Sequence, residues 1–337
     1  MISIPEEAVK RWLNEEQLEE FADKSILVTG ASGVIGKHLI AGLCELNSAH
    51  GLNMKILGWS KSGSFLGIEH YLDQFDQIAG DICDYKNHAN VQEVDLTIHG
   101  SGYGQPQKFM QDPATTIKIN TDITRHLLKK TRERFLFCSS SEVYSGLDTQ
   151  SPTEIEVGTT NSDHPRAPYI ESKKMGEVIT LQLSPNNVIG TVARIALAYG
   201  PGGNLSDSRV LNELIMRGIN NGSVNLMDAG ESIRTYCYVE DSVRMLLNLL
   251  ASGKKEIYNV GGESVLSIAE LGELVSLQLG VPFTKVDSMS GQNGAPAVVT
   301  LSVEKTKEIC GDFEFINIDS GVRKTINWYQ ALIQNCS

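Results

Sequence analysis

Hydrophobic residues along this 337-residue chain follow two different spacings. Short β-branched and apolar runs are typical of buried strands, and longer stretches with apolar residues three or four positions apart are typical of helices. The two kinds of segment alternate from residue 25 to about residue 200, which predicts a parallel sheet covered by helices on both faces. The predicted strands are 25–29, 55–59, 77–79, 95–99, 134–139 and 188–193, and the predicted helices are 34–46, 114–130 and 169–183.

Both ends of the chain depart from this alternation. The first 24 residues carry apolar positions such as Trp12 and Phe21 among many carboxylates, which predicts one amphipathic helix or two short ones. After Tyr199 the pattern becomes mixed. The segments expected there are helices at 209–219, 239–251 and 267–279, a strand at 256–260 and a loop at 288–294. We therefore expect a helical extension (1–24), a main α/β domain (25–200) joined by a returning segment near 235–262, and a smaller interleaved lobe (201–337).

Composition narrows the class of protein. Hydrophobic residues make up 41% of the chain and charged residues 21%, which suits a globular fold rather than a disordered or collagen-like one. The net charge of −12 and the absence of a basic cluster argue against nucleic acid as a partner. No apolar stretch approaches the ~20 residues of a membrane span, and the acidic N-terminus does not resemble a signal peptide. Six cysteines without metal-ligand spacing indicate free thiols, and hence a cytoplasmic protein without a metal site.

A glycine-rich turn lies between the first predicted strand and the first helix of the main domain. Glycines in this position allow a tight turn and a close approach of the backbone to a pyrophosphate, which binds at the helix N-terminus. A Walker A loop is excluded, because the gap before Lys37 is wrong and His38 stands where Ser or Thr binds magnesium. The turn therefore predicts a Rossmann-type doubly wound fold that binds a dinucleotide through Gly30, Ser32, Gly33, Val34, Ile35 and Gly36.

The end of the second strand bears on which dinucleotide binds. An acidic residue here normally holds the adenosine ribose hydroxyls, but this chain has Trp59, Ser60 and Lys61 instead. A hydroxyl and a cation without an acid suit the 2′-phosphate of NADP, whereas a solvated loop would leave NAD as the cofactor. Asp81 and Ile82, after the third strand, are candidates for the adenine edge.

A second group of residues has the features of an acid–base site. Tyr169 and Lys173 are four positions apart, so a helix would place them on one face, where the ammonium would lower the pKa of the phenol. Such a tyrosine can act as a base towards an alcohol. The predicted strand before them ends in a hydroxyl-rich run that contains Ser140 and Glu142. His99, at the end of an apolar strand, is better explained as a core histidine than as a ligand.

Together these motifs resemble the extended short-chain dehydrogenase/reductases, in particular the nucleotide-sugar epimerase/dehydratase group. They are most similar to UDP-glucuronate decarboxylases, also called UDP-xylose synthases. The resemblance runs from about residue 25 to residue 329. Its best-matching stretches are 112–120, 139–144, 165–173, 207–210 and 234–241.

The resemblance implies a role for each matching residue. Ser140 would hydrogen-bond the sugar 4-hydroxyl, Glu142 would be the active-site glutamate, Tyr169 the base and Lys173 the residue that also holds the cofactor. Arg209 and Arg234 would contact the diphosphate or a uronate, although an unaligned arginine is usually a surface charge. Arg166 is a third candidate for substrate binding, and Arg194 is a further one. The implied cofactor is tightly held NAD, with NADP as the alternative, and the implied partners are a nucleotide-diphosphate sugar and a second copy of the chain.

Departures from the family pattern define the alternatives. Ser141 precedes Glu142, so the acid that sugar 4,6-dehydratases use to expel water is missing, and the Ser-Glu pair resembles the decarboxylases. However, Gly202 and Gly203 replace the Arg-Met of those decarboxylases, and a Gly-Ser-Gly-Tyr-Gly run at 100–104 replaces their small residues. A nucleotide-sugar 4-epimerase, a 4-dehydrogenase/reductase and a non-catalytic dinucleotide sensor therefore remain alternatives to the decarboxylase.

Overall fold

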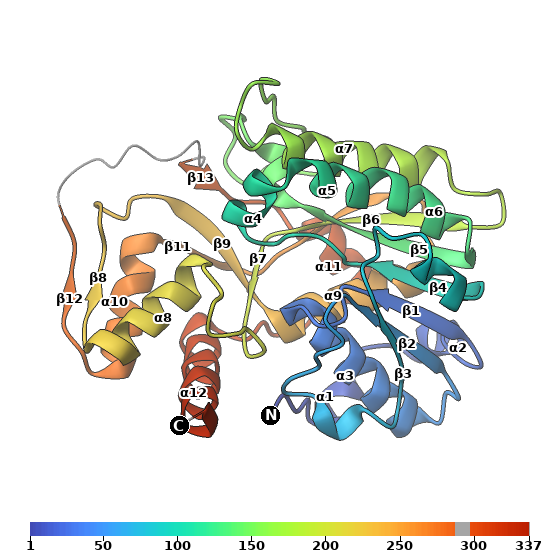
Figure 1. Cartoon of the computed structure of the whole chain (residues 1–337), viewed down its shortest axis with the longest axis horizontal. Helices are drawn as coiled ribbons and strands as arrows, with labels where there is room; N and C mark the ends of the chain where they lie inside the picture. The colour runs from blue at the N-terminus through green and yellow to red at the C-terminus, as the bar shows by residue number, and fades with distance from the viewer. Residues whose placement is uncertain (287–296, 337) are drawn as a thin grey trace.

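The structure, a computed structural model, describes residues 1–286 and 297–336, so the loop expected at 288–294 lies outside the described residues. Seven parallel strands form one large sheet in the order β10-β6-β5-β4-β1-β2-β3 (Figure 1). This order reverses direction next to β1, as in a doubly wound sheet, and it confirms the predicted fold class. The strands are β1 (Ser25–Thr29), β2 (Lys55–Ser60), β3 (Asp76–Ala79), β4 (Val94–His99), β5 (Thr131–Ser140), β6 (Ile189–Ile195) and β10 (Ile257–Val260).

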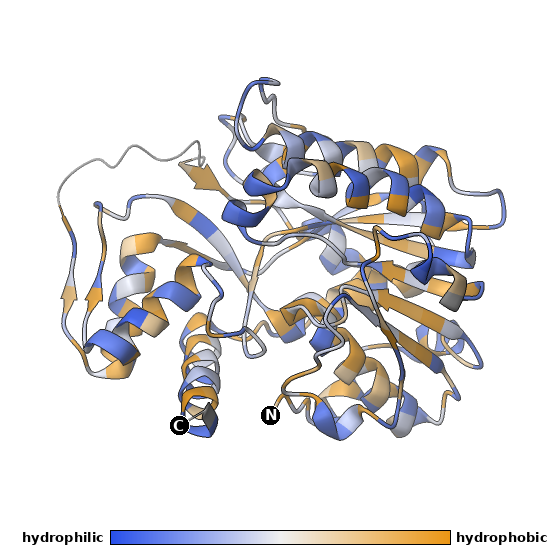
Figure 2. Ribbon diagram, in the orientation of Figure 1, coloured by the Kyte–Doolittle hydropathy of each residue, from blue (hydrophilic) through white to orange (hydrophobic). Residues whose placement is uncertain are grey.

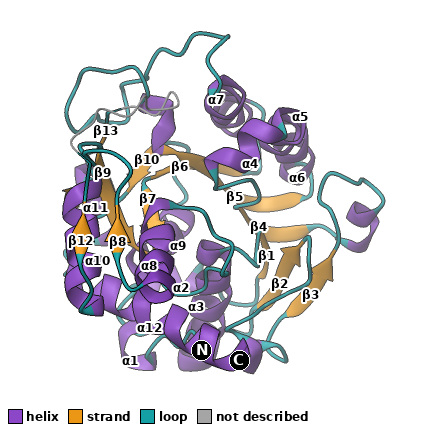
Figure 3. Cartoon of the chain, turned by 60° about the vertical axis from the view of Figure 1, so that its left-hand side comes forward, coloured by secondary structure: helices purple, strands orange, loops and turns teal. Residues whose placement is uncertain are grey.

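Helices cover both faces of this sheet (Figure 3). The helices α3 (Val34–His50) and α9 (Val239–Ser252) pack on one face, and α5 (Pro113–Lys118), α6 (Thr124–Leu128) and α7 (Ala167–Gln182) pack on the other. Each layer encloses its own hydrophobic core, and the strands between them are coloured as mainly hydrophobic (Figure 2). Short helices join some strands: η1 (Glu69–Tyr71), η2 (Asn87–Asn90), α4 (Pro106–Gln111) and η4 (Ser141–Tyr144).

The helix predicted at 114–130 is not one regular helix. A π-helical turn, η3 (Ile119–Ile123), separates α5 from α6. In this region the hydroxyl of Thr121 donates to the Ile117 carbonyl, and that of Thr124 donates to the Asn120 carbonyl. Hydrophobic spacing alone did not indicate this π-helical turn.

The remaining elements form a smaller lobe beside the carboxyl ends of the large sheet (Figure 1). Its main sheet has the strand order β11-β9-β13, with β7 also paired to β9. Within the described residues, α9 and β10 return from this lobe to the large sheet, and α11 packs against both of them. The elements of the lobe and of the chain end are β7 (Leu197–Tyr199), α8 (Val210–Asn221), β8 (Val224–Asn225), β9 (Ile233–Tyr238), β11 (Ser264–Ser267), α10 (Ile268–Leu279), β12 (Phe283–Thr284), β13 (Val298–Val299), α11 (Glu304–Cys310) and α12 (Ile318–Cys336).

The N-terminal extension folds as two short helices, α1 (Glu6–Val9) and α2 (Glu15–Glu19). They pack against α3 and α9 and bury Trp12 and Phe21. Ahead of α1, the Ile2 amide donates to the Gly67 carbonyl at 2.7 Å. The extension is therefore an integral layer of the core. Among the described residues, none of the helices is both long and apolar enough to cross a bilayer.

Candidate active site

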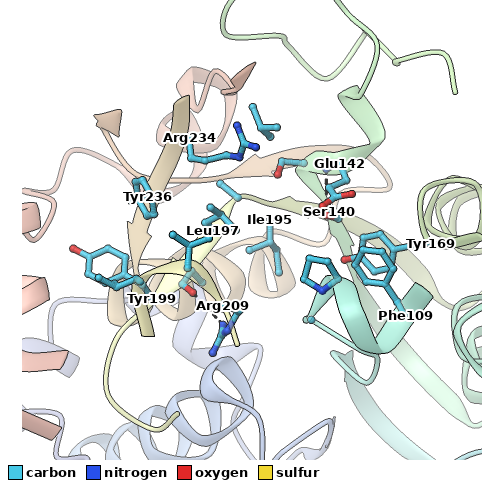
Figure 4. A pocket seen from close by; sticks show the side chains of 18 of the residues that line it. Phe109, Ser140, Glu142, Tyr169, Ile195, Leu197, Tyr199, Arg209, Arg234 and Tyr236 are labelled. Carbon is cyan, nitrogen blue, oxygen red and sulfur yellow. Dashed lines mark hydrogen bonds between the residues drawn. The ribbon is translucent and has the colours of Figure 1, made fainter. Parts of the chain in front are cut away.

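One cavity of about 720 Å³ lies between the carboxyl ends of the large sheet and the smaller lobe. The two sides of the cavity come from segments far apart in the chain, as Figure 4 shows for Tyr169 and Arg234. All four predicted catalytic residues and all three predicted substrate-binding arginines line it. They are Ser140, Glu142, Tyr169, Lys173, Arg166, Arg209 and Arg234, and Ile35 of the predicted cofactor site lines it as well. The other predicted cofactor residues lie outside this lining.

The glycine turn before α3 has the shape of a dinucleotide cradle. Gly30 has a φ of +72°, and a Cβ there would lie 2.6 Å from the carbonyl oxygen of Gly100 at the end of β4. A Cβ on Gly36 would lie 2.2 Å from the carbonyl oxygen of Gly30. The first turn of α3, which begins after Gly33, presents backbone N–H groups towards the turn, where a pyrophosphate fits. Ser32, Val34 and Ile35 belong to the same strand–turn–helix unit.

The residues that are predicted to contact the adenosine of the dinucleotide interact with one another or with other parts of the protein. Ser60 is buried, and its hydroxyl accepts a hydrogen bond from the Gly63 amide at 3.2 Å. The Trp59 indole donates to the Gly80 carbonyl at 3.0 Å. The sequence predicts Lys61 and Asp81 as separate contacts to the dinucleotide, whereas in the structure they form a salt bridge of 2.7 Å. This bond lowers the pKa of the Asp81 carboxyl, and the neighbouring Ile82 belongs to the core.

Tyr169 and Lys173 lie one turn apart on α7, as their spacing predicted. The Lys173 ammonium is 5.8 Å from the centre of the Tyr169 ring and donates to the Cys138 carbonyl at 2.7 Å. The expectation that Lys173 lowers the pKa of Tyr169 is wrong when only the protein's own side chains are considered. Burial and the charge of Glu142 raise the pKa of Tyr169 to about 12, although a hydrogen bond with Ser140 opposes the rise. Burial also lowers the pKa of Lys173 to about 8.

Glu142 is held by a two-point ion pair. Its carboxylate accepts from Nε of Arg166 at 3.0 Å and also from the terminal nitrogen of the same guanidinium. The side chains are only 19% and 8% exposed, respectively, so water screens the pair weakly. Ser140 ends β5 just before, and its hydroxyl accepts from the Glu142 amide at 3.2 Å. The strand end, η4 and the start of α7 thus fix Ser140, Glu142 and Arg166 together.

The smaller lobe contributes the other two arginines. Arg209 lies at the N-terminus of α8, where its guanidinium binds the buried carboxylate of Asp207 with contacts of 2.5 to 3.1 Å. Arg234 on β9 donates to the carbonyls of Ile233 and Ala297, at 2.7 Å and 3.1 Å. The pKa of Arg234 is lowered chiefly by burial, and the charges of Glu142 and Arg166 also act on it.

Arg194 is not a cavity residue. It is fully buried on β6, and its guanidinium binds both carboxylate oxygens of Glu177 at 3.0 and 2.8 Å. Glu177 also accepts from the Ser139 hydroxyl at 2.6 Å, so this pair supports the strand end that carries Ser140. The core assignment of His99 is confirmed, because its ring nitrogens pair with the Thr29 hydroxyl and the Ile119 carbonyl.

Two features of the cavity were missed in the sequence. Asp207 precedes Arg209 by two residues, and this local acid–base pair could have been noticed. Phe109 lines the cavity and stacks on Tyr169, but the two residues are 60 positions apart and no periodic pattern connects them.

Known proteins are similar to most of this chain. UDP-glucuronic acid decarboxylase 1 of Xenopus tropicalis is 26% identical over 324 residues, which cover 94% of this chain and 75% of the relative. UDP-glucuronic acid decarboxylase 6 of Arabidopsis thaliana is 29% identical over 292 residues, which cover 85% and 83% of the two chains. The solved structure of MoeE5 in complex with UDP-glucuronic acid and NAD has a TM-score of 0.73 at 21% identity, covering 91% of this chain and 99% of that one.

The family match agrees with the site. Residues 26–261, which span the large sheet from β1 to β10, match the NAD dependent epimerase/dehydratase family. The matched stretch contains the glycine turn, the Tyr169–Lys173 pair and all three arginines of the cavity. The chain belongs to the NAD dependent epimerase/dehydratase family.

Proposed function

We propose that this protein oxidises a nucleotide-activated sugar at C4 and, when C6 of the sugar is a carboxylate, releases that carboxylate as carbon dioxide. The observation that carries the proposal is the arrangement of groups around one cavity. An acid–base tyrosine with a lysine and a serine lies on one side, and two arginines of the smaller lobe lie across from it. The names of the relatives, UDP-glucuronic acid decarboxylases, support the same substrate class.

In this proposal the chain's own residues bind the sugar and move a proton. A nicotinamide dinucleotide, when bound at the glycine turn, supplies the hydride acceptor and later the hydride donor. Ser140 hydrogen-bonds the C4 hydroxyl, and the Tyr169 oxygen accepts its proton and later returns it to the C4 oxygen when the 4-ketone is reduced again. Lys173 orients the cofactor, and the positive charge of the oxidised cofactor opposes the effect of burial on the pKa of Tyr169.

The charges around the cavity suit an acidic substrate. Glu142 is paired with Arg166, and Arg234 lines the same cavity close enough for the charges of Glu142 and Arg166 to act on its pKa. A 4-ketone makes loss of a C6 carboxylate easy because the product is stabilised as an enolate. Arg166 and Arg234 would hold the carboxylate, while Arg209 would contact the diphosphate.

NAD is the proposed cofactor, with NADP as the alternative. A cycle that returns its hydride to the substrate needs no external supply of reduced cofactor, which favours tightly held NAD. The structure of MoeE5 with NAD and UDP-glucuronic acid, a protein of the same fold, is consistent with this choice. The Lys61–Asp81 salt bridge also partly neutralises the cation that a 2′-phosphate would need.

The test is incubation of the purified protein with NAD and UDP-glucuronate, followed by mass spectrometry of the nucleotide sugars. We expect a UDP-pentose and one carbon dioxide per turnover, without net formation of NADH. Tyr169→Phe is the matched control and should form neither product.

The same experiment separates the alternatives. An isomer of unchanged mass from UDP-glucose or UDP-galactose would identify a 4-epimerase, and accumulation of NADH with a keto-sugar would identify a dehydrogenase. Dinucleotide binding without turnover of any of these sugars would favour a sensor protein. Each of these three outcomes would overturn the decarboxylase proposal.

We also propose that the protein is a cytoplasmic homodimer that pairs through α5 and α7. These helices expose Ile117, Met175 and Val178, each about half accessible, on the outer layer of the molecule. A second copy would bury these side chains, so light scattering should give twice the chain mass and Val178→Glu should give a monomer. The five cysteines whose side chains are described are free thiols, in keeping with a reducing compartment.

A further inference from the structure

The ring of Phe109 on α4 lies flat against the ring of Tyr169. The ring centres are 4.3 Å apart and the ring planes differ by 11°. Figure 4 shows the two rings overlapping beside Ser140. Phe109 is almost fully buried at 2% exposure, so this contact is part of the packed interior and not a chance approach of surface side chains.

Phe109 is held firmly by its own surroundings. The short helix that carries it begins at Pro106 and is followed at once by Asp112, whose side chain caps α5 by accepting from the Thr115 amide at 3.1 Å. The same carboxylate accepts from the Tyr103 hydroxyl at 2.9 Å. This helix packs against both α5 and α7. The ring is therefore presented to Tyr169 from a fixed position.

The same ring also contacts the residue that holds Glu142. The Arg166 guanidinium lies 5.4 Å from the centre of the Phe109 ring, within the range of a cation–π contact. Arg166 and Tyr169 are three residues apart at the start of α7, so both face the same neighbour on α4. One aromatic side chain thus supports the candidate base and also the guanidinium beside it.

A stacked ring restricts what Tyr169 can do. Tyrosine has two free side-chain torsions, and a flat neighbour at 4.3 Å prevents the phenol from rotating out of its plane. The hydroxyl then stays directed towards Ser140, and water is kept from one face of the phenol. Proton transfer depends on such alignment, because a small misplacement of a reacting group costs much of the rate.

We propose that Phe109 is a positioning residue that holds the phenol of Tyr169 in line for proton transfer and keeps Arg166 against Glu142. The proposal rests on the proposed function, in which Tyr169 is the base. It assigns Phe109 no direct contact with the reacting atoms.

The kinetic test compares Phe109→Leu with Phe109→Tyr in the NAD-loaded enzyme turning over UDP-glucuronate. Leucine keeps an apolar side chain but removes the flat surface, so kcat should fall about tenfold while the KM for the sugar changes less than about twofold. Tyrosine keeps the stack and should retain most of kcat. A rise in KM at unchanged kcat would show that the ring binds substrate instead, and would overturn the proposal.

A second readout does not require turnover. In protein labelled with 3-fluorotyrosine, the ¹⁹F resonance of Tyr169 can be assigned by its loss in Tyr169→Phe. Phe109→Leu should move this resonance and let it titrate at lower pH, because water then reaches the phenol. Phe313→Leu, which breaks the Phe313–Phe315 ring pair outside the cavity lining, is the control and should leave it in place.

The two readouts separate failure of this inference from failure of the proposed function. A moved resonance together with no turnover of any nucleotide sugar by the unmutated protein would overturn the function but retain the stacking role. An unmoved resonance in Phe109→Leu would overturn the inference, whatever happens to kcat.

Discussion

The ammonium of Lys37 on α3 donates a hydrogen bond of 3.0 Å to the carbonyl oxygen of Gly202. Lys37 is only 5% exposed, which is unusual for a lysine. The helix that carries it is the one whose N-terminus faces the glycine turn, and the glycine loop that accepts the bond leads to Arg209. This contact therefore ties the candidate dinucleotide site to the part of the smaller lobe that lines the cavity.

The burial of Lys37 predicts a pH dependence of stability. Burial lowers the pKa of Lys37 from 10.5 to about 8. Between pH 8 and pH 10.5 the unfolded chain therefore binds a proton that the folded chain does not, and the folded state gains stability as the pH rises. Relative to Lys37→Met, the unfolding free energy of the unmutated protein should rise by up to about 1.4 kcal/mol per pH unit in this window. Urea titrations at several pH values measure it.

The control for this experiment is Lys55→Met, because the Lys55 side chain is 66% exposed. Its stability difference from the unmutated protein should not change with pH in the same way. Parallel curves for Lys37→Met and the unmutated protein between pH 8 and pH 10 would contradict the assignment.

Replacing Tyr169 by phenylalanine should separate chemistry from binding. The substitution removes only the hydroxyl and keeps the ring that stacks on Phe109. Turnover should fall by at least ~10²-fold, while the dissociation constant for the dinucleotide stays within about twofold. Calorimetry and steady-state kinetics measure the two effects. Lys173→Met should lower both the turnover and the affinity for the dinucleotide. If Tyr169→Phe lost dinucleotide affinity in parallel with turnover, the tyrosine would have a structural role.

Arg234 should affect the sugar nucleotide and not the dinucleotide. It lies on β9, in the smaller lobe, far in the chain from the glycine turn. Arg234→Ala should raise the KM for the sugar nucleotide ~10-fold or more, which corresponds to losing about 1.5–3 kcal/mol of charged hydrogen bonding. Arg132→Ala removes an exposed arginine outside the cavity and should leave the KM unchanged. If both variants have the same KM, Arg234 does not bind this substrate.

The Lys61–Asp81 salt bridge should control the choice of dinucleotide. While Asp81 holds the ammonium at 2.7 Å, a 2′-phosphate gains little from Lys61, so NAD should bind at least as tightly as NADP. Asp81→Asn frees the cation and should shift the preference towards NADP, by up to about tenfold or ~1.4 kcal/mol. Competitive titration of both dinucleotides measures the preference. Tenfold tighter NADP binding by the unmutated protein, abolished in Lys61→Ala, would reverse this assignment.

Features that depend on local spacing were predictable from the sequence. The apolar run before Gly30 and the helical pattern after it predicted β1 and α3, and the four-residue spacing of Tyr169 and Lys173 placed both on one face of α7. Strand-end positions likewise brought Ser140 and Glu142 to the cavity. In each case neighbours in the sequence remain neighbours in the fold, so a periodic pattern carries the information.

Features that depend on distant partners were not predictable. The ion pairs of Arg166 with Glu142 and of Arg194 with Glu177 join separate elements, and so does the stack of Phe109 on Tyr169. The direction of the Tyr169 pKa shift failed for the same reason, because burial outweighs the single charge that the spacing revealed. The burial of a polar group such as the Tyr169 phenol depends on the assembled fold, and the apolar pattern that predicts buried strands does not indicate it.

The path of the chain limits how this protein can be re-engineered. After β6 the chain enters the smaller lobe, returns to the large sheet as α9 and β10, and leaves it again at β11. A cut after β6 would separate β10 from the other strands of the large sheet. A cut after β10 would separate β9 from β11, which pair in the small sheet. The smaller lobe therefore cannot be removed or exchanged as one continuous segment of the chain. A chimera in which this lobe is replaced by that of a protein with another specificity needs several matched junctions, because a single junction cannot include the whole lobe.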